Sequence, residues 1–125
     1  MLVKGVGTDL VEVARIERSL AKHGDHFAER ILSSKEYAGF QEAKDQANYV
    51  AKRFAVKEAV SKALGTGFSE GITWKDIELE HLGSGQPYTV LHGKAKNKLE
   101  AYGAEGIYIS LSDEAGLVTA FAVLS

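Results

Sequence analysis

Residues 54–67 read Phe-Ala-Val-Lys-Glu-Ala-Val-Ser-Lys-Ala-Leu-Gly-Thr-Gly, and this stretch constrains the fold more than any other. Wound as a helix, it places the Glu58 carboxylate near the middle of an apolar stripe, which comprises Ala47, Val50, Ala51 and Phe54. Ser61 and Lys62 lie on its next turn. A carboxylate at the centre of an apolar stripe is costly unless a partner compensates its charge.

Two explanations for Glu58 stay open on the residues alone. Lys62, four residues later, can form an i,i+4 ion pair with it. Alternatively, a metal ion and an anionic ligand lie there, because Mg²⁺ is held by one or two carboxylates together with phosphates and water. Asp9 is the best second carboxylate, since it follows a predicted strand. Alternatively, Asp9 binds no metal and only caps the next helix.

The helix that contains Glu58 is predicted to be the longest, from Asp45 to Leu64, with Gly65 at its C′ position. It is apolar or small nearly all the way round, which is typical of a core helix. Four elements are predicted before it: a strand over Leu2–Val6, a helix over Leu10–Lys22 capped by Thr8 or Asp9, a short helix over His26–Leu32, and a helix opened by the capping box Ser33–Glu36.

The second half of the chain is predicted to be mainly strands. Turn residues separate alternating apolar segments there, which indicates hairpins. The expected elements are strands over Ile77–Leu82 and Tyr88–Leu91, a helix over Lys94–Tyr102, and a final hairpin of Ile107–Ser112 with Leu117–Leu124. Helices in the first half and antiparallel strands in the second predict an α+β fold.

Composition sets the broad class of the protein. The 125 residues, 45% hydrophobic and 26% charged, suit a single folded domain over residues 1–125. The net charge of −2 argues against nucleic-acid binding, and the absence of cysteine excludes disulfides and thiolate chemistry. No apolar run approaches the roughly 20 residues that span a membrane, and the start lacks signal-peptide features. We therefore expect a cytoplasmic protein without a membrane partner.

One helix face carries a basic stripe. Arg15, Arg18 and Lys22 recur at i, i+3 and i+7 on the first predicted helix. Three charges in this pattern are commonly only a solvated face. Because the same helix follows Asp9, an acidic partner docked on it would lie close to the proposed metal.

Two motifs extend these observations to the whole chain. The first is Gly5-x-Gly-x-Asp9, followed by Arg15-Ile16, and the second is Arg53-Phe-Ala-x-Lys-Glu58-Ala with Lys62-Ala-x-Gly-Thr-Gly67. In this order they resemble holo-acyl-carrier-protein synthases, the short class of 4′-phosphopantetheinyl transferases. The resemblance implies transfer of 4′-phosphopantetheine from coenzyme A to a serine of apo-acyl carrier protein. Adenosine 3′,5′-bisphosphate would be released, in support of fatty acid biosynthesis.

The resemblance also implies roles for individual residues. Asp9 and Glu58 would be the Mg²⁺ ligands, and Lys62 would lie by the diphosphate. Arg53 and Ser61 would contact coenzyme A. On the basic stripe, Arg15 would meet the acidic recognition helix of the carrier protein, with Arg18 and Lys22 beside it.

The resemblance also implies an oligomeric state, and the chain differs from the family motifs at two places. The short class implies a homotrimer with active sites at subunit interfaces. Many members have Ser-x-Ser-His where this chain has Ser110-Leu-Ser-Asp113, and Gly-Lys-Pro where it has Gly85-Gln86-Pro87. In the family the histidine lies near the nucleotide phosphate, which the Asp113 carboxylate would repel. Gln86 in place of lysine would remove one positive charge from the substrate cleft.

Two other functions remain as alternatives to a transferase. A non-catalytic module for a carrier protein or nucleotide has no need of both Asp9 and Glu58. A metal-dependent phosphohydrolase would need a residue that positions water, and none is evident in the sequence.

Overall fold

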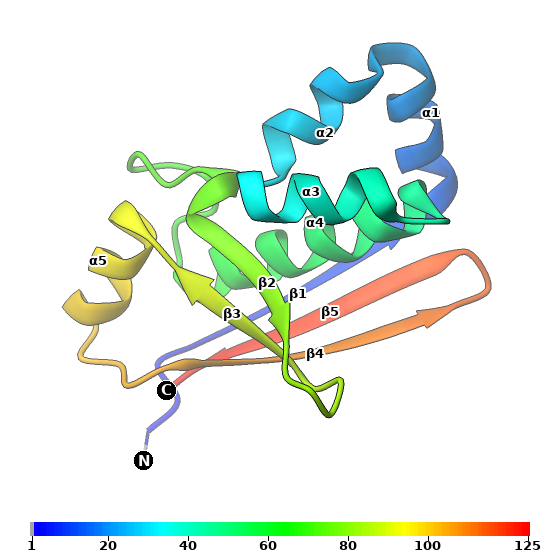
Figure 1. Ribbon diagram of the computed structural model, residues 1–125. Coiled ribbons are helices and arrows are strands. Elements are labelled where there is room, and N and C mark those ends of the chain that lie inside the picture. The colour runs from blue at the N-terminus through cyan, green and yellow to red at the C-terminus, as the bar shows by residue number, and fades with distance from the viewer. Residues whose placement is uncertain (1) are drawn as a thin grey trace.

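The computed structural model describes residues 2–125, which form helices packed against a curved antiparallel sheet (Figure 1). The α+β prediction is confirmed. The elements in chain order are β1 (Gly5–Glu12), α1 (Val13–His23), α2 (Asp25–Ile31), α3 (Ser34–Glu42), α4 (Gln46–Ala63), the 3₁₀ helix η1 (Trp74–Asp76), β2 (Ile77–His81), β3 (Pro87–Leu91), α5 (Gly93–Ala101), β4 (Ile107–Glu114) and β5 (Leu117–Leu124).

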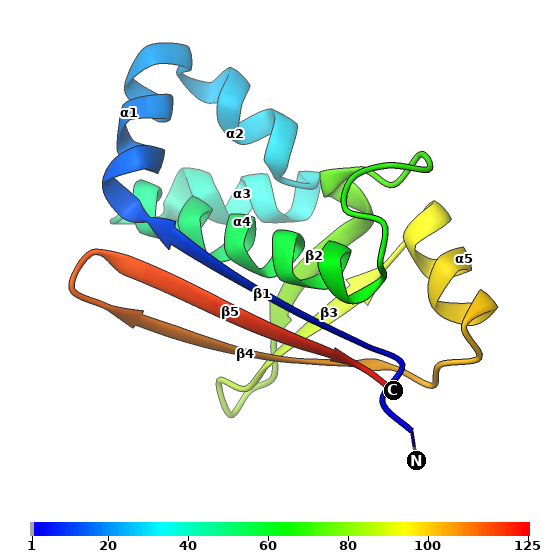
Figure 2. The ribbon, with the colours of Figure 1, turned by 180° about the vertical axis from the view of Figure 1, so that it is seen from behind.

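The strands form two antiparallel sheets. β5 lies between β1 and β4, and the register of β1 on β5 runs from Gly5 opposite Leu124 to Glu12 opposite Leu117. β2 and β3 form a separate hairpin. Figure 2 shows α4 between the three-stranded sheet and the helices α2 and α3. Among the described helices, none is long and apolar enough to cross a membrane.

Helix α4 is the centre of the core, as its all-round apolar pattern predicts. Its start is capped by Asp45, whose side chain accepts the Asn48 N–H at 3.1 Å. Its end is followed by Gly65 at φ 79°, a left-handed conformation that favours glycine. Ten of its residues are buried: Ala47, Val50, Ala51, Ala55, Val56, Lys57, Ala59, Val60, Ser61 and Ala63.

The N-terminal prediction is wrong in one respect that affects the site. We expected a strand over Leu2–Val6 and a helix from Leu10 capped by Thr8 or Asp9. Instead β1 continues to Glu12 and places Asp9 inside the strand. The reason is the long pairing of β1 with β5, which satisfies the backbone of these residues more fully than a helix start would.

A buried ion pair joins α3, α4 and β2. Lys57, whose side chain is 0% exposed, donates to Glu36 at 2.7 Å and to the carbonyls of Trp74 and Ile77. Glu36 also completes the predicted capping box with Ser33 and accepts the Leu79 N–H at 2.9 Å. Because both charges have several partners, the pair is satisfied although it is buried.

The C-terminal hairpin is confirmed with a tighter turn than expected. β4 continues to Glu114, so the turn consists of Ala115 and Gly116, at φ 54° and 77°. Two residues with positive φ suit the twist of a hairpin.

Candidate active site

Strand β1 lies directly on the backbone of α4. A methyl group added at Gly5 would stand 2.0 Å from the Ala63 carbonyl oxygen, and one at Gly7 would stand 1.9 Å from that of Ala59. No side chain fits in either space. The two glycines are two residues apart on the strand, and the two carbonyls are four residues apart on the helix. These separations are nearly equal in length, because two strand residues advance about 6.6 Å and four helix residues about 6 Å. Glycine within a strand is the sequence signal for such close contact.

Asp9 is the next residue on this face of β1, and it brings a carboxylate beside α4. The charge of Asp9 is close enough to Glu58 to affect its ionisation. Burial first, and Asp9 second, raise the pKa of Glu58 above its usual value of 4.5, while Lys62 and Arg15 oppose the shift. The structure therefore brings together the two carboxylates that the sequence singled out.

Lys62 pairs with Asp9 across the two elements. Its amine donates to the Thr8 carbonyl at 2.9 Å and to Asp9 Oδ1 at 3.3 Å. Among residues 2–125, no basic side chain forms an ion pair with Glu58 within 4.0 Å. The explanation of Glu58 by a local ion pair with Lys62 is therefore wrong.

The two carboxylates fit a divalent cation. Asp9 Oδ2 is buried and has no hydrogen-bond partner within the described part of the chain. Carboxylate oxygens suit Mg²⁺, which binds one or two of them and keeps other positions for phosphates and water. No group of three or more His, Cys, Asp or Glu that could hold a metal occurs among residues 2–125. An ion at this pair would have open positions for a ligand.

Ser61 lies under the site. Its side chain is buried, and its hydroxyl donates to the Glu58 carbonyl at 2.8 Å. The Ser61 carbonyl accepts the amides of Thr66 and Gly67 at 3.3 and 3.1 Å. Ser61 thus fixes both the turn that carries Glu58 and the loop that leaves α4.

Arg53 lies on a different face of α4. Five residues separate it from Glu58, which corresponds to a rotation of roughly 140° about the helix axis. Its guanidinium stacks 3.5 Å from the Tyr49 ring centroid and donates to the Tyr49 carbonyl at 3.2 Å. Arg53 Nε is buried without a hydrogen-bond partner among the described residues. Burial lowers the pKa of Arg53, so its charge is poorly compensated within one chain.

The predicted basic stripe forms an exposed face of α1. Arg15, Arg18 and Lys22 are all exposed, while Ile16 packs into the core behind them. Arg15 lies 5.8 Å from the Phe54 ring centroid, and its charge acts on Glu58. The stripe therefore starts beside the carboxylate pair and leads away from it.

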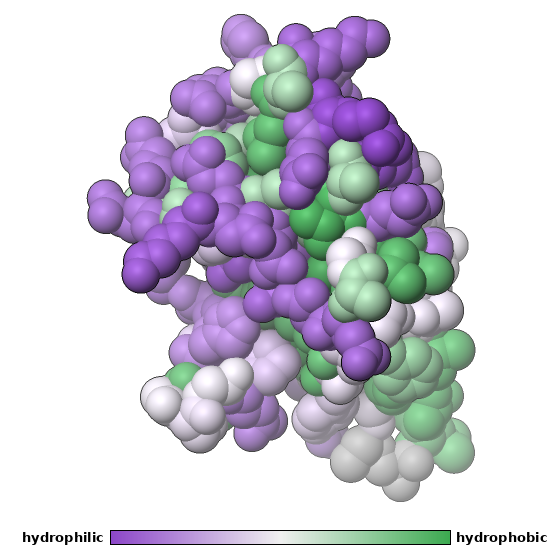
Figure 3. All heavy atoms as spheres, turned by 90° about the vertical axis from the view of Figure 1, so that its right-hand side faces the viewer, coloured by the Kyte–Doolittle hydropathy of each residue, from purple (hydrophilic) through white to green (hydrophobic). Residues whose placement is uncertain are grey.

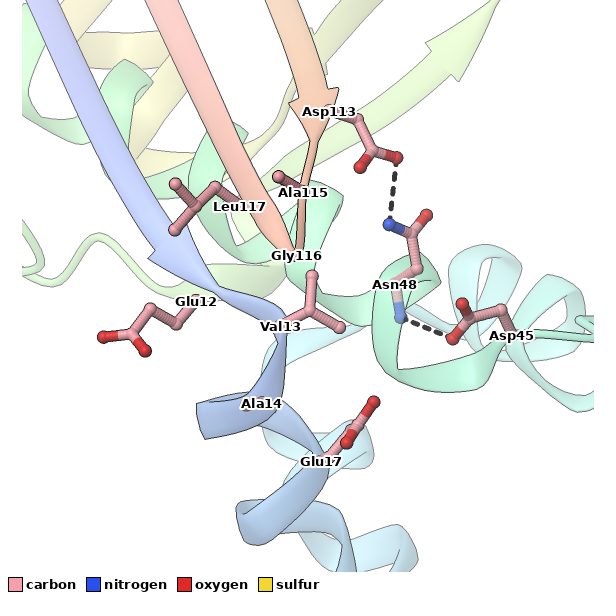
Figure 4. A pocket seen from close by; sticks show the side chains of 10 residues that line it. All are labelled: Glu12, Val13, Ala14, Glu17, Asp45, Asn48, Asp113, Ala115, Gly116 and Leu117. Carbon is pink, nitrogen blue, oxygen red and sulfur yellow. Dashed lines mark hydrogen bonds between the residues drawn. The ribbon is translucent and has the colours of Figure 1, made fainter.

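A cleft of about 720 Å³ lies at the C-terminal end of β1 and is acidic (Figure 4). Its lining includes four carboxylates, from Glu12, Glu17, Asp45 and Asp113. Asn48 donates to Asp113 at 2.9 Å, and Lys52 approaches Asp113 at 3.5 Å. The acidic lining does not suit a phosphate ligand, and Asp113 here joins the β4–β5 hairpin to α4. No local pattern in the sequence predicts this contact, because it links residues 65 positions apart.

Known proteins share the fold and much of the sequence of this chain. Residues 5–121 match the family described as the 4′-phosphopantetheinyl transferase superfamily. A holo-[acyl-carrier-protein] synthase from Halorhodospira halophila is 47% identical over 123 residues, which cover 98% of each chain. The crystal structure of the Neisseria meningitidis synthase has a TM-score of 0.94 at 39% identity and covers 99% of both chains. The Helicobacter pylori synthase in complex with coenzyme A has a TM-score of 0.83 at 32% identity, covering 96% of this chain and 99% of that one.

These similarities define an enzyme class that transfers phosphopantetheine. The chain belongs to the 4′-phosphopantetheinyl transferase superfamily. Within it, the relatives that match nearly its full length are named holo-[acyl-carrier-protein] synthases.

The carboxylate pair predicts a pH-dependent cost to stability. Because the pKa of Glu58 is raised in the folded protein, the folded state holds more protons than the unfolded state, and stability falls as pH rises through that range. Without metal at neutral pH, Glu58→Gln should raise the melting temperature by roughly 1–4 °C. Differential scanning calorimetry at pH 4 and pH 7.5 measures this, and the gain should shrink at pH 4.

Glu100→Gln is the control for this experiment, because Glu100 is exposed on α5. It should leave the melting temperature unchanged at both pH values. A Glu58→Gln variant that is less stable than wild type at pH 7.5 would show that the carboxylate is satisfied within the chain.

Proposed function

We propose that the protein transfers the 4′-phosphopantetheine group of coenzyme A to a serine of apo-acyl carrier protein, with Mg²⁺, and releases adenosine 3′,5′-bisphosphate. The carboxylate pair of Asp9 and Glu58 carries this proposal, together with the buried Asp9 Oδ2, which has no hydrogen-bond partner among residues 2–125. The proposed setting is the cytoplasm and the process is fatty acid biosynthesis. The family and the names of the relatives support this reaction type.

Asp9 and Glu58 would hold the magnesium ion. When bound, Mg²⁺ would supply Lewis acidity and a template for the diphosphate. The carboxylates lie on a strand and a helix in close backbone contact, so the scaffold keeps them near each other before a ligand arrives.

Lys62 would offset charge on the leaving phosphate. Its side chain is 50% exposed, so its amine would reach a diphosphate by exchanging its contacts with the Thr8 carbonyl and with Asp9, at 2.9 and 3.3 Å. Ser61 and Arg53 would contact coenzyme A. No enzyme nucleophile is needed, because the attacking serine arrives on the carrier protein, and catalysis consists of positioning and charge neutralisation.

The Glu58 carboxylate suits the removal of the serine proton. A carboxylate within reach of the attacking hydroxyl acts as a general base. A water molecule at the site is the other acceptor consistent with this arrangement.

The exposed face of Arg15, Arg18 and Lys22 would bind the acidic helix of the carrier protein. Opposite charges on two surfaces steer their encounter and fix their relative orientation. A partner on this face reaches Glu58 from the Arg15 side, where the stripe begins.

We further propose a homotrimer with active sites between subunits. The face of the sheet turned away from α4 exposes apolar side chains, including Val6, Leu10, Tyr108 and Phe121, which are 57%, 64%, 59% and 47% exposed. Figure 3 shows apolar surface gathered at the lower right of the molecule. Exposed apolar patches of this kind mark interfaces.

The separation of Arg53 from Glu58 on α4 supports a composite site. If both residues contact one coenzyme A, the roughly 140° between them is more easily bridged by two subunits than by one. Arg53 of one subunit would then complete the site that Asp9, Glu58 and Lys62 form in its neighbour.

The mass of the carrier protein gives a direct test of transfer activity. The protein is incubated with apo-acyl carrier protein, coenzyme A and Mg²⁺, and the carrier is examined by mass spectrometry for the added phosphopantetheine. We expect wild type to modify the carrier and Glu58→Ala to lose most activity, by roughly a hundredfold or more, because one metal ligand is lost. No modification by wild type would contradict the function, and full activity of Glu58→Ala would contradict the mechanism.

Arg15→Glu separates carrier docking from coenzyme A binding in the same assay. It should raise the KM for the carrier protein by at least about tenfold at low salt and leave coenzyme A affinity nearly unchanged. Equal losses for both substrates would place Arg15 in the nucleotide site or the fold.

Mixed trimers test whether the site is shared. Asp9→Asn and Arg53→Ala variants, each inactive alone, are coexpressed in equal amounts and assayed for transfer. If the two residues act from different subunits, random mixing restores about a quarter of wild-type activity per site.

The matched control mixes Asp9→Asn with Glu58→Gln, which belong to the same half of the site. This mixture should stay inactive. An inactive mixture of the Asp9 and Arg53 variants, or a fully active monomer by light scattering, would contradict the shared site.

A further inference from the structure

Lys57 and Glu36 carry buried charges that the proposed reaction does not use. Lys57 precedes Glu58 on α4, and its side chain is 0% exposed. Its amine lies 2.7 Å from the Glu36 carboxylate and donates to the carbonyls of Trp74 and Ile77 at 2.9 and 2.5 Å. An ammonium group has three N–H donors, so each donor of Lys57 has an acceptor. A fully satisfied buried amine of this kind is rigidly held.

Glu36 is held as firmly on its own side of the pair. Besides Lys57, it accepts the backbone N–H of Ser33 at 3.0 Å and that of Leu79 at 2.9 Å. The Ser33 hydroxyl in turn donates to Glu78, the neighbour of Leu79 on β2. The ion pair therefore joins α4 to α3, η1 and β2 through directional hydrogen bonds.

Lys57 and the contact with β1 hold α4 from different sides. The carbonyls of Ala59 and Ala63 meet the glycines of β1. At about 100° per residue, these two alanines lie roughly 160° and 120° around the helix from Lys57. Glu58, one residue after Lys57, lies roughly 100° from both Lys57 and Ala59. The Glu58 side chain therefore leaves α4 between the two contacts that hold the helix.

The contact with β1 restrains the distance between strand and helix more than the rotation of the helix. Glycine against a carbonyl is a van der Waals contact, which lacks the directionality of a hydrogen bond. Turning α4 by about 15° would move a carboxylate about 6 Å from the helix axis by roughly 1.6 Å. Because the groups of a binding site need to be held within about 0.5 Å, such a rotation would spoil the pairing of Glu58 with Asp9.

The Glu58 carboxylate has no cationic anchor of its own. No basic side chain of residues 2–125 forms an ion pair with it, whereas Asp9 is paired with Lys62 at 3.3 Å. The direction of Glu58 therefore depends on the rotation of α4, which Lys57 restrains one residue earlier.

We propose that Lys57 and Glu36 are positioning residues for the metal site. Their ion pair fixes the rotation of α4 about its own axis and so directs the Glu58 carboxylate toward Asp9. The inference rests on the proposed function and adds to it two residues that touch neither substrate nor metal. A buried polar pair in this role specifies one arrangement, whereas apolar side chains of similar volume supply packing without direction.

The test removes the direction of the pair and keeps its volume. In the variant Lys57→Met with Glu36→Gln, methionine replaces the lysine stem, and glutamine retains an amide oxygen for the Leu79 N–H. Since both charges are replaced, no lone buried ion remains, and circular dichroism should show a folded protein. Its Mg²⁺ affinity in the presence of coenzyme A, measured by isothermal titration calorimetry, should fall at least about tenfold. In the transfer assay, kcat should fall by a similar factor, while the KM for the carrier protein stays within about twofold.

Ile31→Val is the matched control, because Ile31 is a buried apolar residue of α2 outside this hydrogen-bond network. It lowers stability by the loss of one methylene group and should leave Mg²⁺ affinity and kcat unchanged at a temperature where it is folded. Lys57→Gln is a second variant, which shortens the side chain by one bond and leaves Glu36 an amide donor. If the pair variant does not fold, Lys57→Gln should still lose at least about threefold in Mg²⁺ affinity.

Wild-type Mg²⁺ affinity in either folded Lys57 variant would overturn the proposal, as would an equal loss of affinity in Ile31→Val. If wild type transfers phosphopantetheine and the Lys57 variants bind Mg²⁺ equally well, the positioning role alone fails. Absence of transfer by wild type would instead reject the function on which it rests.

Discussion

The close contact between β1 and α4 is the constraint on which the rest of the site depends. With Gly5 and Gly7 against the carbonyls of Ala63 and Ala59, strand and helix backbones approach closer than any side chain allows. The pairing of β1 with β5 then continues the strand through Asp9 to Glu12. As a result, two carboxylates from residues 49 positions apart in sequence come together, with Lys62 bound to one of them.

The buried pair of Lys57 and Glu36 holds the other side of α4 in place. Removal of one partner of such a pair is strongly destabilising, because it leaves an uncompensated charge in the core. Lys57 also donates to the Trp74 carbonyl, so this contact holds η1 against α4. Adjacent residues of one helix thus have separate tasks: Lys57 faces inward and stabilises, while Glu58 faces the site.

Most elements could be predicted from local patterns, since their signals lie within a few residues. The cap at Asp45, the capping box at Ser33 and the glycine after α4 are examples. The sequence offers Thr8 or Asp9 as a helix cap and does not show that Asp9 lies within a strand, because its strand partners are more than 100 residues away in β5. In the same way, spacing suggested Lys62 as a partner for Glu58, whereas tertiary packing gives it to Asp9. The different face of Arg53 follows from helix geometry, whereas the role that we propose for Arg53 requires a second subunit.

The central claim is that backbone contact at Gly7 positions Asp9 and Glu58 to hold magnesium. Isothermal titration calorimetry of Mg²⁺ in the presence of coenzyme A tests it on wild type, Asp9→Asn and Gly7→Ala, with Gly83→Ala as control because a methyl group there meets open space. The account predicts that Asp9→Asn and a folded Gly7→Ala each lose at least about tenfold in Mg²⁺ affinity, while Gly83→Ala keeps it. Wild-type affinity in Asp9→Asn, or in Gly7→Ala with native circular dichroism, would contradict it.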